Sequence, residues 1–130
     1  MRLSLIAVGR LRDGPERDLV DEYLDRAGRL ARGHGFTGPH EAEVEPRRAS
    51  GPAAEAKAIG RALEPGMALV CLDERGRALP SPDFAARLRD WRDAGRPSAG
   101  VVIGGADGLD ADLRGRADLV LSFGPMVWPH

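Results

Sequence analysis

Residues 98–110 read Ser98-Ala99-Gly100-Val101-Val102-Ile103-Gly104-Gly105-Ala106-Asp107-Gly108-Leu109-Asp110. The first half contains a short run of β-branched residues, which is typical of a buried strand, and this run stops at a pair of glycines. A third glycine follows before a polar segment, residues 109–117, in which a helix is expected. The stretch therefore predicts a strand, a turn and the start of a helix.

The glycines at positions 104, 105 and 108 allow two interpretations. Glycine adopts positive φ easily and lets the main chain come close to a ligand, which favours a binding loop. A plain structural turn fits the same residues, because Gly-Gly-x-x-Gly differs from the dinucleotide fingerprint and no Gly-Lys-Ser/Thr follows to make a P-loop. The residues alone leave both interpretations open.

Strand and helix patterns alternate along the whole chain. Strands are predicted over residues 3–8, 36–45, 67–72, 98–103 and 119–123, and helices over residues 15–33, 53–63, 81–94 and 109–117. This order predicts an α/β fold, an open and mostly parallel sheet with helices on both faces, in a single domain spanning residues 1–130. The first helix is predicted to be amphipathic, with a repeat formed by Leu19, Tyr23, Ala27 and Leu30 and with Val20, Leu24 and Ala31 alongside.

Ligands of open parallel sheets bind at the carboxyl ends of the strands. Three such ends are distinctive in this sequence: Leu72-Asp73, Gly104-Gly105 and Phe123-Gly124-Pro125. We expect a ligand where these ends meet.

Composition excludes several classes of protein. The chain has 130 residues, 42% of them hydrophobic, and a net charge of −1, so it generates no strong overall field for a polyanion, and any nucleic-acid binding needs local patches. Its apolar runs are too short to cross a membrane and its N-terminus lacks a secretory core, so we expect a cytoplasmic protein. The histidines and the single cysteine, Cys71, show no metal-ligand spacing, so no metal is expected, and Cys71 lies in an apolar run that predicts a buried, inert thiol.

Arginine makes up 18 of the 19 basic residues, because Lys57 is the only lysine. Codon usage in a GC-rich genome explains this bias, and so does selection for bidentate contacts with phosphate. We favour the genomic explanation.

The three strand ends, in this order and followed by Trp128-Pro129-His130, resemble the ribosomal RNA large subunit methyltransferase H family of SPOUT-class enzymes. The resemblance runs along nearly the whole chain, through Leu5-Ile6-Ala7-Val8-Gly9, Glu22-Tyr23-Leu24, Val70-Cys71-Leu72-Asp73 and Ile103-Gly104-Gly105-Ala106-Asp107-Gly108-Leu109. It implies a homodimer with a trefoil-knotted sheet that uses S-adenosylmethionine to methylate N3 of a pseudouridine in 23S ribosomal RNA, on assembled ribosomes or large subunits.

The resemblance also implies which residues form the site. S-adenosylmethionine would be held by Leu72, Gly104, Gly105, Gly124, Pro125, Met126, Val127, Trp128 and Pro129. His130 would accept the proton of the target nitrogen or hold the nucleotide, as the only histidine close to this site.

Family members continue beyond the Pro-His pair with a further helix and a tail that complete the knot, and this sequence has neither. We therefore expect a shortened chain with an incomplete knot and little methyl transfer. Two other functions stay open: a catalytically silent ribosome-binding or dimerisation module of the same fold, and a general nucleotide or phosphate binder that uses residues 104–108.

Overall fold

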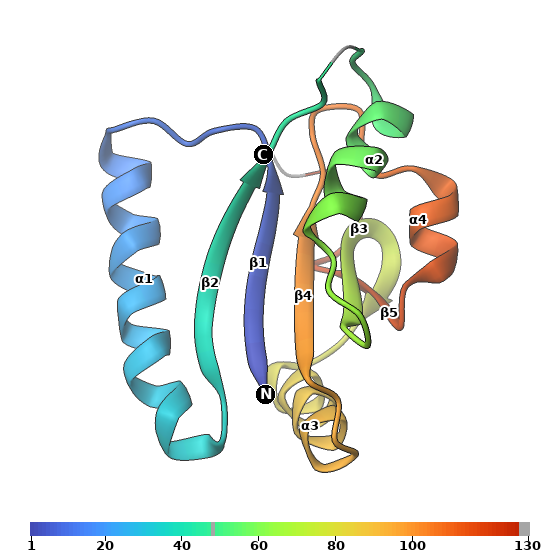
Figure 1. Ribbon diagram of the computed structural model, residues 1–130. Coiled ribbons are helices and arrows are strands. Elements are labelled where there is room, and N and C mark those ends of the chain that lie inside the picture. The colour runs from blue at the N-terminus through green and yellow to red at the C-terminus, as the bar shows by residue number, and fades with distance from the viewer. Residues whose placement is uncertain (48, 128–130) are drawn as a thin grey trace.

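The computed structural model describes residues 1–47 and 49–127. Five strands form one sheet in the order β2-β1-β4-β3-β5, and all four neighbouring pairs are parallel (Figure 1). The elements follow one another as β1 (Arg2–Val8), α1 (Pro15–Ala31), a 3₁₀ turn (Arg32–His34), β2 (Thr37–Val44), α2 (Pro52–Ala62), β3 (Ala68–Ala78), α3 (Ser81–Asp93), β4 (Ser98–Ile103), α4 (Ala111–Arg116) and β5 (Leu119–Ser122). The predicted α/β fold with a parallel sheet is confirmed.

Helices cover both faces of the sheet, because alternate side chains of a strand point to opposite faces. One face packs against α2 and α4 and contains the larger core cluster: Ile6, Ile59, Met67, Leu69, Cys71, Val102, Leu109 and Leu113. The other face packs against α3, where Phe84 and Trp91 contact Val70, Leu119 and Leu121. Among residues 1–47 and 49–127, no helix combines the length and the apolar character that a membrane crossing needs.

Helix α1 packs against β2 through only part of its predicted apolar face. Val20, Leu24, Ala27 and Ala31 are buried or partly buried, as predicted. Leu19, Tyr23 and Leu30 are 53%, 57% and 69% exposed, so the prediction is wrong for these three residues. The helix comes close to the sheet at Gly28, since a Cβ there would lie only 3.2 Å from the main-chain oxygen of Gly38. Three large side chains on α1 are thereby left facing solvent.

Strand β3 continues beyond the residue at which its apolar run ends. The sequence predicts a strand up to Leu72 followed by a loop, but β3 extends to Ala78, and Leu121 of β5 is paired both with Leu72 and with Arg77. A strand residue has one hydrogen-bonding edge on each side, so Leu72 and Arg77 lie on opposite edges of Leu121. The chain therefore crosses β5 between these two pairings.

Gly76 makes this crossing possible. A Cβ at Gly76 would lie 2.5 Å from the main-chain oxygen of Val120 and 2.9 Å from the nitrogen of Leu121, so no larger residue fits without moving β5. The crossing is the kind of threading that the family resemblance implies for this part of the sheet. The expectation that the knot is incomplete is not tested by these contacts and stays a prediction.

We expect Gly76→Ala to lower the free energy of unfolding by about 1–3 kcal/mol, because the added methyl group meets main-chain atoms that cannot rotate away. Gly60→Ala is the matched control, since a Cβ at Gly60 in α2 meets nothing within 4 Å. This control variant should be unchanged or more stable by up to about 1 kcal/mol. Urea unfolding of both variants measures the difference, and equal stabilities would show that the crossing has room for a side chain.

Candidate functional site

A cavity of about 380 Å³ lies at the carboxyl ends of β3, β4 and β5. Its lining comes from three segments: residues 72–75, residues 103–109, and Leu121 with Phe123, Gly124, Met126 and Val127. The structure thus brings together the three strand ends that the sequence singles out.

Six of the residues predicted to hold a cofactor line this cavity: Leu72, Gly104, Gly105, Gly124, Met126 and Val127. Pro125 lies within the same segment but does not line the cavity. Trp128, Pro129 and His130 lie outside the described residues. All the described residues of the predicted cofactor site except Pro125 therefore line the same cavity.

The β4–α4 loop is held in a tight turn by its own main chain. The N–H of Gly108 donates to the main-chain oxygen of Gly105 at 3.0 Å, and Gly108 has a φ of +80°, which L side chains rarely adopt. A Cβ at Gly104 would lie 2.8 Å from Cδ2 of Leu109, so the first glycine allows the loop to fold back on the start of α4.

Gly105 lines the cavity, but its Cβ position faces a carboxylate. A Cβ at Gly105 would lie 2.6 Å from Oε1 of Glu55, in the first turn of α2. The space on the Cβ side of Gly105 is therefore taken by Glu55, and only the main chain of this glycine is open to the cavity. No sequence pattern indicates this contact, since Glu55 lies in an alanine-rich helix that is typical of a core element.

Glu55 is also unusual in its hydrogen bonding. Its Oε2 atom is buried and has no hydrogen-bond partner among the described residues. Buried polar atoms almost always have a hydrogen-bond partner, so Oε2 of Glu55 can accept a hydrogen bond from a group that binds next to the Gly105 loop.

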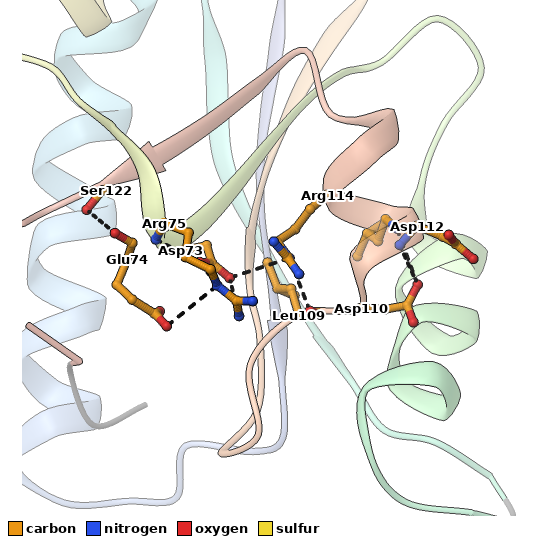
Figure 2. Close-up of polar contacts among 9 residues, drawn as sticks. Asp73, Glu74, Arg75, Leu109, Asp110, Asp112, Arg114 and Ser122 are labelled. Atoms are coloured by element: carbon orange, nitrogen blue, oxygen red, sulfur yellow. Dashed lines mark hydrogen bonds and ion pairs between the residues drawn. The ribbon is translucent and has the colours of Figure 1, made fainter. Parts of the chain in front are cut away.

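Asp73 joins the end of β3 to the β4–α4 loop. Its side chain is 2% exposed, and Oδ1 accepts hydrogen bonds from the main-chain N–H of Arg75 at 2.9 Å and from Nε of Arg75 at 3.0 Å. Oδ2 lies 3.7 Å from Nε of Arg114, which donates to the main-chain oxygen of Leu109 at 3.4 Å. Figure 2 shows Asp73 between the two arginines, so one carboxylate holds two walls of the cavity together.

The helix that carries Arg114 is fixed by a side-chain cap. Oδ2 of Asp110 accepts hydrogen bonds from the main-chain N–H of Asp112 at 3.0 Å and from that of Leu113 at 3.3 Å (Figure 2). Such caps satisfy N–H groups that have no partner within the helix, and they contribute about 0.5–2 kcal/mol. The cap and the fully buried Leu113 together set the position of α4 relative to the cavity.

Ser122 joins the third wall to the first. Its buried hydroxyl donates a hydrogen bond toward the main-chain oxygen of Glu74 at 3.3 Å (Figure 2). The hydroxyl also lies 2.7 Å from the main-chain oxygen of Gly124, and it accepts a hydrogen bond from the N–H of Gly124 at 3.0 Å. Gly124 has a φ of +121°, so a glycine suits this turn even though nothing lies within 4 Å of its Cβ position. The sequence indicated the glycine but not the serine that orients it.

Cys71 contributes no reactive group to the site. Its side chain is buried in the core, and burial, together with the nearby charge of Asp73, raises its pKa to about 11. The thiol is therefore protonated at neutral pH, which confirms the prediction of an inert, buried cysteine. Within the described part of the chain there is no group of three or more side chains that could hold a metal ion.

The chain has an α/β fold with a parallel sheet, and a family model described as "Predicted SPOUT methyltransferase" matches residues 1–130, so the chain is an α/β enzyme of the SPOUT type. Three relatives named "Ribosomal RNA large subunit methyltransferase H" match all 130 residues, with 58% identity in Cereibacter sphaeroides, 55% in Paracoccus denitrificans and 52% in Ruegeria pomeroyi. This chain covers 83% of each relative.

The chain belongs to the ribosomal RNA large subunit methyltransferase H family, and it is a methyltransferase. The family resemblance and the enzyme class predicted from the sequence are confirmed.

We expect Asp73→Ala to lower the free energy of unfolding by about 1–3 kcal/mol, because it leaves the N–H of Arg75 and the charge of Arg114 without their buried acceptor. Asp25→Ala is the control, since Asp25 forms an exposed ion pair with Arg29 on α1. Exposed pairs contribute about 0–1 kcal/mol, so the control should change stability little. Urea unfolding tests this, and equal losses in the two variants would show that Asp73 does not brace the cavity.

Proposed function

We propose that this methyltransferase uses S-adenosylmethionine to methylate N3 of a pseudouridine in 23S ribosomal RNA, on assembled ribosomes or large subunits. The observation that carries the proposal is the gathering of three strand ends on one cavity in a chain of this family. The names of the relatives support ribosomal RNA of the large subunit as the substrate.

The cavity has the size and the lining that such a cofactor needs. Sites for small molecules are commonly about 300–1,000 Å³ in volume, and this cavity is about 380 Å³. Leu72, Met126 and Val127 supply apolar surface for the faces of an adenine ring, and the main chain of the glycine loops supplies donors and acceptors for its edge. Glu74 and Asp107 line the same cavity and bring carboxylates to the cationic end of the cofactor.

S-adenosylmethionine supplies a methyl group that is already activated, so the protein has to bind, orient and exclude water. Asp73, Arg114 and Ser122 act as positioning residues in this proposal, because they fix the walls and are not themselves needed to touch the reacting atoms. N3 of the target base loses a proton during transfer, and we assign its acceptance, or the holding of the nucleotide, to His130. Gly104, Gly105, Gly124, Pro125, Trp128 and Pro129 complete the proposed cofactor site.

Calorimetry with S-adenosylmethionine, ATP and NAD tests the proposal, together with transfer of a labelled methyl group to large ribosomal subunits. S-adenosylmethionine should bind at least about tenfold more tightly than ATP or NAD, since neither matches the cationic end of the cofactor. Ser122→Ala should weaken this binding by about tenfold, the loss expected for one hydrogen bond that orients the Gly124 turn, whereas the exposed Ser81→Ala should not. Equal affinity for all three ligands would favour the general nucleotide binder. Cofactor binding without any labelled transfer would refute methylation by the 130-residue chain and leave the cofactor site in place.

We also propose that the protein is a cytoplasmic homodimer. Phe123, Met126 and Val127 form an exposed apolar group beside the cavity, and a second copy would cover it. Analytical ultracentrifugation at micromolar concentration should show a dimer. A monomer over the whole concentration range would refute this part of the proposal.

A further inference from the structure

A second, shallower groove of about 340 Å³ lies where the chain crosses β5. Arg75, Gly76 and Arg77 of β3 form one side, residues 117–120 form another, and Arg87 of α3 completes it. Arg75 also lines the proposed cofactor cavity, so the groove and the cavity are neighbours that share a side chain.

The positive charge of this groove is only partly compensated. Arg75 pairs with Asp73 at 3.0 Å, but neither Arg77 nor Arg87 forms an ion pair within the part of the chain that the structure describes. Asp118 is the only acidic residue in the groove lining, and its Oδ2 already accepts hydrogen bonds from the N–H of Leu69 at 2.8 Å and from Arg96 at 3.4 Å. Two guanidinium groups are thus left available for an anion.

Arg87 is held at its guanidinium group, and Arg77 is held through its main chain. The guanidinium of Arg87 lies 5.9 Å from the centre of the Trp91 ring, and Trp91 packs against the core. Arg77 is anchored by the pairing of its main chain with Leu121 in the crossing. A guanidinium group donates two parallel hydrogen bonds to the oxygens of a phosphate. Phosphate binding costs less side-chain entropy at Arg87, because the ring of Trp91 already restricts its guanidinium.

We propose that Arg77 and Arg87 bind phosphate groups of the ribosomal RNA backbone next to the target nucleotide. This inference rests on the proposed function for its ligand. The chain has a net charge of −1, so a polyanion needs a local basic surface, and this groove places one beside the cavity. Phosphate contacts position a nucleic acid and do not read its sequence, so the groove orients the RNA while other groups select the base.

The test is cosedimentation of the whole chain with large ribosomal subunits at several salt concentrations. The Arg77→Ala/Arg87→Ala double variant should bind at least about tenfold more weakly, and the slope of log affinity against log salt should fall in magnitude by about 1–2. The control is Arg32→Ala/Arg61→Ala, which removes the same charge from arginines that do not line the groove. This control should keep both the affinity and the slope of the wild type.

Calorimetry with S-adenosylmethionine on the same variants separates this inference from the proposed function. The double variant should bind the cofactor as tightly as the wild type, because neither Arg77 nor Arg87 lines the cavity. Absence of cofactor binding in the wild type would refute the proposed function while leaving the ribosome result interpretable. The inference is overturned if the folded double variant binds subunits as tightly as the control does, whether or not inorganic phosphate binds the groove. It is also overturned if the wild type binds no subunits.

Discussion

The contact between Gly76 and the main chain of β5 is the constraint on which the site depends. It allows β3 to pair with Leu121 on one edge through Leu72 and on the other through Arg77. Because the chain crosses β5 at this point, the segment that follows Leu72 cannot leave the sheet as an ordinary loop. It is held across the carboxyl ends of the strands, where it forms a wall of the cavity and one side of the arginine groove.

Four polar contacts convert this topology into a defined site. Asp73 connects the crossing segment to Arg114 and, through it, to Leu109, and Ser122 connects the same segment to the Gly124 turn. Each hydrogen bond contributes about 0.5–1.5 kcal/mol, so their effect on stability is modest. Their effect on function is expected to be larger, because a displacement of about 1 Å in a reacting group can cost roughly a hundredfold in rate.

Local pattern was sufficient to predict most of the fold and the meeting of three strand ends at the candidate site. The β-branched runs, the glycines after Ile103 and the order of elements predicted the parallel sheet, and the strand ends at Leu72, Gly104 and Phe123 meet as expected. The crossing was not predictable from local pattern, because it is a contact between Gly76 and Val120 that leaves no periodic signal, and only the family resemblance implied a threaded chain. The apolar face of α1 was predicted only in part, because the close approach at Gly28 leaves Leu19, Tyr23 and Leu30 exposed. Glu55 and Arg114 were missed for the same reason, since each matters only through a neighbour distant in sequence.

The central claim is that the three strand ends form a single cofactor site. Titration of the isotope-labelled chain with S-adenosylmethionine, followed through its amide resonances by NMR, tests this claim most directly. The account predicts that residues 72–75, 103–109 and 121–127 shift together with one binding curve, while the exposed side of α1 around Tyr23 does not. Shifts confined to one of the three segments, or centred on another part of the sheet, would contradict it.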